Sequence, residues 1–390
     1  MCNLSSSAST SSAPGDVSGG AAGGSTSGTQ TCCPDVAEFK KRTTRKDYFG
    51  FDDKTNMVAS GSNPYWVPPT ASKTAPASNT DRDGSVWLSV EKGKTTKCNL
   101  AFTNNLTCIR NCTYDVSGSH ASVVNAAITA NNARFDILGV SEGDVTIKVI
   151  CNGKPIGWVH VACWVRKTYS VAVCEVNQLI ALPGGAAGPP QLQLPRPSKS
   201  VAEFQAFFDD AWRDAAVKVA LTGVPVHYAT TTEADLSPGG DIWDANGNPE
   251  FNHVIGNFTT MTNATDRIHA AASAANPGYD KYLYLCVAPG NMSGRMVAGF
   301  ANSLPGAYGF FFNQGTRSLS TACHEFGHLV GLRHMNDTAG AAQYAPHLRL
   351  PGSDTTNINA LDQFNLMGYG SPRANRKRLR YHQWKSVQGR

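Results

Sequence analysis

The sequence predicts a multidomain protein, in which an all-β sandwich precedes an α/β (α+β) domain with a twisted mixed sheet. Three observations predict this fold class. Residues 80–166 alternate apolar and polar side chains between turn residues, and residues 167–390 alternate strand-like with helix-like patterns. The first 31 residues are mostly Ser, Gly, Ala and Thr, which bury little apolar surface and therefore predict a disordered tail.

The start of the chain is expected to have no fold of its own. We assign residues 1–45 to a disordered low-complexity tail and residues 46–79 to an aromatic and proline-rich linker. The runs DYFGFDD and PYWVPP make this linker more aromatic than a plain spacer. We therefore expect it to pack on a neighbouring domain, and docking of a partner is the alternative.

Residues 80–166 carry the β-sandwich pattern. SVWLSVEKG alternates apolar and polar residues before a glycine turn, and Asn152-Gly153 separates two further alternating runs, as in a β-hairpin. Short strands with turns at this spacing are typical of sandwiches. Cys151 and Cys163 flank the hairpin and could pair across it.

Residues 167–390 carry the mixed pattern. Strands are predicted at 169–176, 224–229, 281–288 and 306–315. Ser200 and Glu203 form a capping box that begins a helix, whose apolar stripe runs to Val219 and which Gly223 is expected to end. Further helices are predicted near 264–275, from about 318 through the histidine-containing run described next, and near 376–388.

The run HEFGHLVGLRH has the spacing of a catalytic zinc site. His324 and His328 are four residues apart, so on a helix they project from one face and can bind one metal ion. Glu325 lies about 100° further round the helix and can reach a water held by the metal. Gly331 lets the chain leave the helix, so that His334 returns as third ligand. Three protein ligands leave a position for water, as in catalytic rather than structural zinc sites.

The complete pattern, HExxHxxGxxH, resembles that of the metzincins, zinc endopeptidases that include matrixins, astacins, serralysins and pappalysin-like enzymes. Downstream, NLMGYG places Met367 where the family has a tight methionine turn beneath the metal. Tyr369 follows where astacins and serralysins carry a tyrosine that can approach zinc. The resemblance implies a metzincin-like zincin fold with one catalytic Zn²⁺, Glu325 as general base and Tyr369 as a further catalytic residue.

The resemblance also implies a function. The expected activity is a zinc-dependent endopeptidase, which hydrolyses peptide bonds with a metal-activated water. In the family the fourth strand is an edge strand, with which extended substrate pairs. The residues that would form it here are Gly309, Phe310, Phe311, Phe312 and Asn313. The alternatives are a zinc amidase that acts on cell-wall peptides, and an adhesion or binding protein. The intact Glu325 and all three histidines argue against a binding protein.

A second resemblance covers part of the β-sandwich. TYDVSG and ARFDILGVSEGDVTIKV are similar to bacterial immunoglobulin-like (BIG2-type) repeats, in which a glycine-rich turn, here Gly139 to Gly143, precedes a late strand. Tyr114 stands where these repeats usually carry tryptophan. Such domains act as spacers or as adhesive modules, and we expect a spacer.

Cysteine usage and the N-terminal residues indicate different compartments. The chain has 11 cysteines, and their cluster between Cys98 and Cys174 favours disulfides and an oxidising destination. Cys286 and Cys323 lie in apolar stretches and are expected to be buried thiols. The N-terminal residues carry neither the basic nor the apolar region of a signal peptide. We therefore expect secretion without a conventional signal peptide, as for an exported bacterial effector or toxin; a cytoplasmic location is the alternative.

The expected partners follow from charge and hydropathy. The net charge of +5 is mild, and the basic runs at 40–46 and 373–380 are assigned to solvated faces, so no nucleic acid partner is expected. No apolar run is long enough to span a membrane. The substrate is expected to be a protein or peptide, and an exported enzyme would also meet a secretion machinery or an immunity protein.

Overall fold

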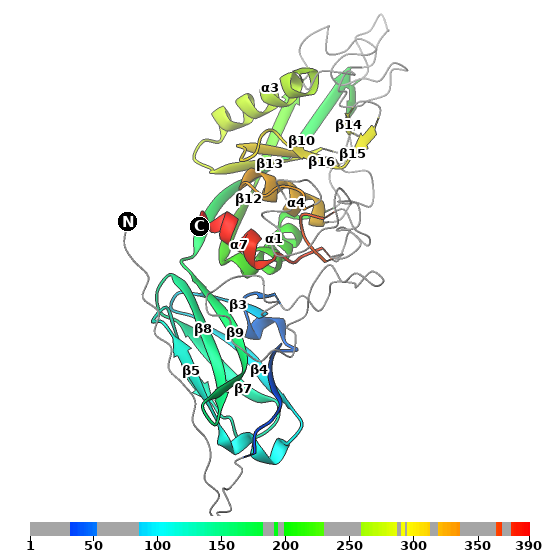
Figure 1. The fold of residues 1–390 in the computed structure, drawn as a ribbon. Helices are drawn as coiled ribbons and strands as arrows, with labels where there is room; N and C mark the ends of the chain where they lie inside the picture. Colours follow the sequence, from blue (N-terminus) through cyan, green and yellow to red (C-terminus); the bar gives the residue numbers. More distant parts are fainter. Residues whose placement is uncertain are drawn as a thin grey trace, which may run out of the picture.

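A β-rich unit and a mixed α/β unit follow one another along the chain, and Figure 1 shows them stacked, the β-rich unit below. The computed structural model describes residues 32–52, 86–181, 191–193, 199–229, 259–286, 290–292, 295–312, 319–335, 364–368 and 376–390. Among these residues, no helix is both long and apolar enough to cross a membrane.

The β-rich unit consists of two sheets. The first has the antiparallel order β1-β4-β7-β6, from Val36–Lys41, Thr95–Thr103, Ala133–Gly139 and Ala121–Ala126. The second has the order β2-β3-β9-β8-β5, from Phe51–Asp52, Val86–Glu91, Lys154–Trp164, Gly143–Cys151 and Cys112–Ser117. Within it only the described pair β3 and β9 is parallel. Two short 3-10 helices complete the unit: η1 (Arg45–Asp47) and η2 (Leu106–Asn111).

The two sheets share one apolar core. Phe39, Leu100 and Phe135 of the first sheet belong to the same buried cluster as Leu88 and Val161 of the second. The alternating burial along β4 follows from the period of two that the sequence shows. A sandwich of two packed sheets is thus present, whereas its kinship with immunoglobulin-like repeats stays a prediction.

The predicted hairpin is also present. β8 and β9 pair as antiparallel neighbours on either side of Asn152 and Gly153. Both turn residues have positive φ, 50° and 75°, as a two-residue turn of this kind requires.

The β-rich unit begins well before residue 80. β1 pairs with β4 and places Ala37 and Phe39 in the core, and β2 pairs with β3. The prediction of a tail over 1–45 is therefore wrong for 36–41, because VAEFKK alternates apolar and polar residues and supplies an edge strand. Residues 1–31 and 53–79 lie outside the described residues.

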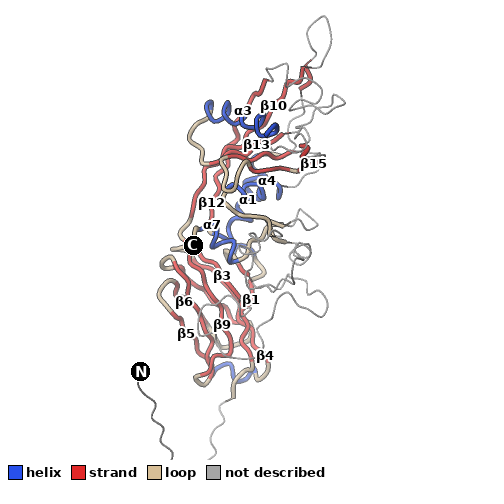
Figure 2. Tube along the Cα trace, turned by 45° about the horizontal axis from the view of Figure 1, so that its top comes forward, coloured by secondary structure: helices blue, strands red, loops and turns tan. Residues whose placement is uncertain are grey.

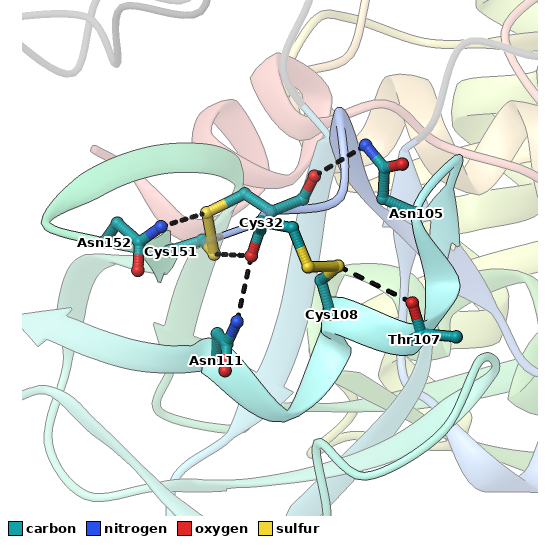
Figure 3. The surroundings of a disulfide bond; sticks show 8 residues. Cys32, Asn105, Thr107, Cys108, Asn111, Cys151 and Asn152 are labelled. Atoms are coloured by element: carbon teal, nitrogen blue, oxygen red, sulfur yellow. Dashed lines mark hydrogen bonds between the residues drawn. A yellow bond between two sulfur atoms is a disulfide. The ribbon is translucent and has the colours of Figure 1, made fainter. Parts of the chain in front are cut away.

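Two disulfides tie the first described residues to this unit. Cys32 is bonded to Cys108 in η2, and Cys33 is bonded to Cys151 at the end of β8. Figure 3 shows Asn111, whose side-chain amide donates to the backbone carbonyl of Cys32 at 2.9 Å. The prediction of at least one disulfide is confirmed.

The remaining described cysteines are buried thiols. The predicted pairing of Cys151 with Cys163 is wrong, because Cys151 is bonded to Cys33 and Cys163 is free. Cys286 and Cys323 are buried thiols outside any disulfide, as predicted. The two cysteines lie at opposite ends of the hairpin, where Cys151 faces Lys154 and Cys163 faces Gly143, so they do not meet, and a partner from the N-terminal segment bonds Cys151.

The mixed unit is built on a six-stranded sheet of order β11-β10-β13-β17-β16, with β12 also paired to β10. Its strands are β10 (Lys167–Ala181), β11 (Gln191–Gln193), β12 (Val217–Ala229), β13 (Lys281–Cys286), β16 (Gly299–Ala301) and β17 (Tyr308–Phe312). β10, β12, β13 and β17 run parallel, whereas β11 and β16 run antiparallel to their neighbours. A small hairpin of β14 (Gly290–Met292) and β15 (Arg295–Val297) lies between β13 and β16 in the sequence.

Helices cover both faces of this sheet, as Figure 2 shows. Side chains alternate along a strand, so Leu283 and Leu285 of β13 face one buried cluster, and Tyr282 and Tyr284 face another. The first cluster includes residues of α1 (Val201–Ala211), α4 (Leu319–Leu329) and α7 (Tyr381–Gln388). The second includes residues of α3 (Thr259–Ala275). The predicted strands and helices of this unit are therefore present, with shifted ends.

The first helix ends earlier than predicted. The capping box of Ser200 and Glu203 is formed, and α1 then ends at Ala211 and continues as the short 3-10 helix η3 (Trp212–Ala215). Ala216 turns the chain at φ 52°, and β12 begins directly afterwards. Val219 and Gly223 are therefore strand residues, because a positive-φ turn at Ala216, which no glycine marks, ends the helix.

The two units are packed together. Trp87 and Trp164 of the β-rich unit belong to the same buried cluster as Trp384 of α7. Trp87 stacks on Tyr381 with ring centroids 3.6 Å apart. The interpretation of 373–380 as a solvated helical face is wrong for Arg376 and Arg380, which are buried, since α7 begins only at Tyr381 and the residues before it enter this junction.

Candidate metal centre

Helix α4 carries the first two histidines and is anchored by its opposite side. Phe326 packs edge-on against the rings of Trp212 and Phe208, with centroids 5.0 and 5.6 Å apart. The indole N–H of Trp212 donates to the Cys323 sulfur at 3.0 Å. Phe326 lies on the far side of the helix from His324 and His328 by the 3.6-residue repeat, so this packing directs the histidines away from the apolar cluster.

Gly331 brings the third histidine back towards the helix. Its φ is +96°, and its N–H donates to the carbonyl of His328 at 3.0 Å. Leu332 N–H donates to the carbonyl of Gly327 at 2.9 Å. The chain thus reverses directly after α4, in a conformation that favours glycine, and His334 comes to lie beside His324 and His328.

The three imidazoles converge through their Nε2 atoms. His334 Nε2 lies 2.9 Å from Nε2 of His328 and 3.2 Å from Nε2 of His324. Nitrogen ligands about 2.0–2.1 Å from a tetrahedral zinc ion would be roughly 3.3 Å apart. Both distances are close to this value, and the three ligand atoms all lie within 4.8 Å of one another, so a single small cation could bind between them.

The tautomers fit a cation as well. His324 Nδ1 lies 2.8 Å from the carbonyl of Leu366, and His328 Nδ1 lies 2.6 Å from the carbonyl of Leu332. A carbonyl oxygen only accepts, so Nδ1 must carry the proton and Nε2 must carry a lone pair. The lone pairs of these two Nε2 atoms are turned towards His334 Nε2, and a cation between the three rings could accept them. These donors therefore suit zinc.

The histidines are held in the neutral form that binds metals. Burial holds the pKa of His324 well below its ordinary value, and the neighbouring His328 and His334 act in the same direction. Burial, followed by His328, lowers the pKa of His334 to about 4. At neutral pH protons therefore compete little with a metal ion at His324 and His334.

Glu325 is buried against the edge of the sheet. Its side chain is 5% exposed, and burial raises its pKa to about 8, against the opposing charge of Arg376. Gly299 of β16 lies so close that a Cβ there would come within 2.9 Å of Glu325 Oε1. A carboxylate with a raised pKa beside a metal centre can accept and return a proton near neutral pH.

The predicted methionine turn packs directly beneath α4. Met367 is fully buried, and a Cβ on Gly327 would lie 2.5 Å from its sulfur, so the glycine is needed for this approach. Leu366 in the same turn accepts the hydrogen bond from His324. The turn thus contacts the helix between its two histidines. Tyr369 lies outside the described residues.

The predicted substrate strand is not an edge strand. Gly309 to Phe312 belong to β17, which lies between β13 and β16; Asn313 lies outside the described residues. The prediction is wrong because a further strand, β16 (Gly299–Ala301), pairs with β17, and three residues are too few to give a strand pattern in the sequence. Among the described strands of this sheet, β16 is the one at that edge.

Three residues near the centre were not predicted. Gly299 gives no sequence signal, because only its approach to Glu325 makes it special. Arg376 lies in a basic run assigned to solvent, yet it is 4% exposed and its charge opposes the rise in the Glu325 pKa. Asn365 precedes the methionine and accepts a hydrogen bond from Met367 N–H at 2.9 Å. Asparagine commonly caps its own turn, so it could have been found.

Comparisons with known proteins add little to these observations. No protein-family model matches the chain, and no curated protein matches it. Among solved structures, archaemetzincin from Methanopyrus kandleri is 14% identical with a TM-score of 0.32, over 56% of this chain and 94% of that one. The S-layer protein SbsC is 21% identical with a TM-score of 0.18, over 21% of this chain and 12% of that one. With TM-scores this low, neither likeness supports a statement about function.

Proposed function

We propose that the protein is a zinc-dependent endopeptidase of the metzincin type. The observation that carries the proposal is the convergence of the Nε2 atoms of His324, His328 and His334, with the buried side chain of Glu325 on the same helix. The pattern HExxHxxGxxH and the buried methionine turn support the same assignment.

Each residue then has a defined role. Zinc, when bound, supplies a Lewis acid that acidifies water and polarises the scissile carbonyl. Glu325 takes a proton from the attacking water and returns it to the leaving amine, for which a pKa near neutrality is suitable. Tyr369 is proposed to donate a hydrogen bond to the oxyanion. Substrate in extended form would pair with β16, the strand at the edge.

The experiment compares the wild type with Glu325→Gln on a mixture of unfolded proteins, by counting new N-termini. Glutamine keeps the shape but cannot act as a base, so cleavage should fall by about 10²- to 10⁴-fold with zinc retained. Glu142→Gln, at an exposed glutamate of the β-rich unit, is the matched control and should cleave normally. Undiminished cleavage by Glu325→Gln would refute the role of Glu325.

The same assay separates the alternatives. A wild type that releases peptides from purified cell wall but cleaves no protein would favour the zinc amidase. A wild type that binds zinc but cleaves neither protein nor cell-wall peptides, and that binds to cells through its β-rich unit, would favour an adhesion protein. Nothing in the described residues favours these alternatives over the endopeptidase.

We further propose that the protein works in an oxidising compartment, as an exported enzyme. The disulfides at Cys32 and Cys33 support this, because such bonds are rare in reducing compartments. Four of the ten described cysteines are disulfide-bonded, so unfolded protein from an oxidising compartment should present fewer than eleven reactive thiols. Eleven reactive thiols would contradict the proposal. A secretion machinery or an immunity protein as partner stays a prediction.

A further inference from the structure

We propose that the N-terminal segment Arg45–Asp52 positions the zinc ligand His324, so that the β-rich unit is a working part of the metal centre and not a spacer. The inference rests on the proposed function, because it concerns the same metal. It is carried by a continuous series of buried hydrogen bonds that runs from Asp52 through the residues around α7 to the methionine turn. Figures 1 and 2 show α7 at the junction of the two units, next to β3.

The series begins at Asp52, at the end of β2. Its side chain is 2% exposed and binds the start of α7 with both oxygens. Oδ1 accepts from Arg380 Nη1 at 2.9 Å, and Oδ2 accepts from the backbone N–H of Tyr381 at 3.1 Å. Arg380 is itself buried, so the loss of this carboxylate would remove a negative charge that lies beside a buried positive one.

The first turn of α7 then fixes the methionine turn. Arg380 N–H donates to Gln383 Oε1 at 2.9 Å. The amides of Gln383 and Asn365 exchange two hydrogen bonds, at 2.9 and 3.2 Å. Asn365 Oδ1 in turn accepts from Met367 N–H at 2.9 Å. Asn365 and Gln383 are both buried, and so a shift at one is transmitted to the other.

The series ends on a metal ligand. Leu366 N–H donates to the carbonyl of Arg378 at 2.8 Å, which ties the methionine turn to the residues before α7. The carbonyl of Leu366 accepts from His324 Nδ1 at 2.8 Å. This carbonyl fixes the tautomer and orientation of His324, and therefore the place of its Nε2 lone pair.

A second contact from the same segment supports the same residues. Arg45 pairs with Asp214 at 2.5 Å and with Asp210 at 3.0 Å. Asp214 is 2% exposed, and its other oxygen accepts from Leu379 N–H at 3.4 Å. Arg378 also pairs with Asp210, at 3.5 Å. Residues 378–381 are therefore held by both ends of the segment, through Asp210 and Asp214 at Arg45 and directly at Asp52.

Asp52 and Gln383 are thus positioning residues, which act on the metal through His324. Outer-shell partners of metal ligands typically change metal affinity by about 10- to 100-fold. Asp52 is further from the metal than such a partner, so we expect an effect at the lower end, about tenfold.

The test uses the full-length, zinc-loaded protein and the variant Asp52→Asn. Zinc release to a chelator is followed with time, and the visible spectrum of the cobalt-substituted protein reports the geometry of the ligands. Asp52→Asn should release zinc about tenfold faster and should shift the cobalt spectrum. The matched control is Asp136→Asn, since Asp136 is also a buried carboxylate of the β-rich unit, paired with Arg134 at 2.5 Å.

Each outcome decides the matter. Wild-type zinc release and an unchanged spectrum in Asp52→Asn overturn the inference, and so does an equal change in Asp136→Asn, which would indicate general destabilisation. Should Asp52→Asn not fold, Gln383→Met removes the amide contacts to Asn365 without exposing a charge and must give the same shift. A wild type that binds no zinc defeats the proposed function itself, and zinc analysis of the wild type alone identifies that case.

Discussion

Histidines lie on both faces of the six-stranded sheet, and their ring nitrogens have different partners on the two faces. On the face of α3, His269 Nδ1 lies 2.9 Å from the hydroxyl of Tyr284, and its ring stacks on Tyr308 with centroids 4.4 Å apart. On the face of α4, the Nε2 atoms of His324, His328 and His334 converge on one another.

The comparison shows that burial alone does not identify a metal ligand. Burial lowers the pKa of His269 as it lowers those of His324 and His334. The difference is in the partners. Tyr284 can donate as well as accept, so it suits His269 in either tautomer. On the other face, backbone carbonyls hold the Nδ1 atoms of His324 and His328, and their Nε2 lone pairs converge on His334 Nε2. Orientation of the ring nitrogens separates a structural histidine from a ligand.

The largest expected effect is that of His334→Ala. Removing this ligand leaves two protein ligands, so zinc affinity should fall by well over 100-fold, beyond the range of outer-shell partners. Equilibrium dialysis against a weak chelator measures the loss, and the β-rich unit should stay folded because it has its own core. Stoichiometric zinc with full activity would mean that another residue, such as Asp337 or Asp362, is the third ligand.

Gly299→Ala should have the next largest effect, on turnover and not on zinc. The new methyl group would lie 2.8 Å from Glu325 Cγ and 2.7 Å from the backbone oxygen of Phe310, which cannot easily move. The carboxylate must shift instead, and we expect kcat to fall by about tenfold or more, within the range of a general base.

Gly309→Ala is the control for that substitution. Its methyl group would lie 3.6 Å from Glu325 Cβ, an ordinary contact, and would touch only the carbonyl of Phe300 closely, at 3.1 Å. Zinc content and kcat are measured for both variants. An equal loss of kcat in the two, or a loss of zinc in Gly299→Ala, would show that the site depends on the sheet in another way.

Local spacing explains what the sequence could predict. The positions of His324, His328 and His334 follow from one helix and one glycine turn, and the capping box at Ser200 is equally local. These features need no knowledge of distant residues, and the structure forms the helix, the turn and the capping box at the predicted positions.

The features that the sequence could not predict depend on pairing between residues far apart in the chain. β1 is a strand because β4 offers it an edge, and β16 is a strand because β17 does. Cys151 bonds Cys33 across 118 residues, and no spacing rule gives such a partner. Asp52 likewise meets Arg380 only through the packing of the two units, so this contact could not be predicted from either segment.

His269→Phe should lower stability and leave the metal untouched. Phenylalanine can keep the stack on Tyr308, but it has no ring nitrogen to pair with the hydroxyl of Tyr284. Tyr284 is fully buried. A buried hydroxyl that loses its partner costs about 1–3 kcal/mol in free energy of unfolding. Denaturant titration measures this cost, and zinc retention should equal that of the wild type. Loss of zinc would break the comparison between the two faces.

The smallest expected effect is a pH dependence carried by His269. Burial lowers its pKa in the folded state, whereas the unfolded chain has the ordinary value of about 6.5. Its contribution to stability is therefore complete above about pH 6.5 and is lost as the pH falls from there through the lowered folded-state pKa.

The measurement is the difference in free energy of unfolding between the wild type and His269→Phe, both free of metal, from pH 8 to pH 5. The other histidines are common to both proteins and cancel. The difference should shrink as the pH falls, because the unfolded chain takes up a proton more readily than the buried ring does. Asp266 opposes the shift, and its carboxylate would favour a charged ring. A difference that grows as the pH falls would therefore mean that Asp266 prevails over burial, and His269 would be a charged partner of that carboxylate instead of a neutral partner of Tyr284.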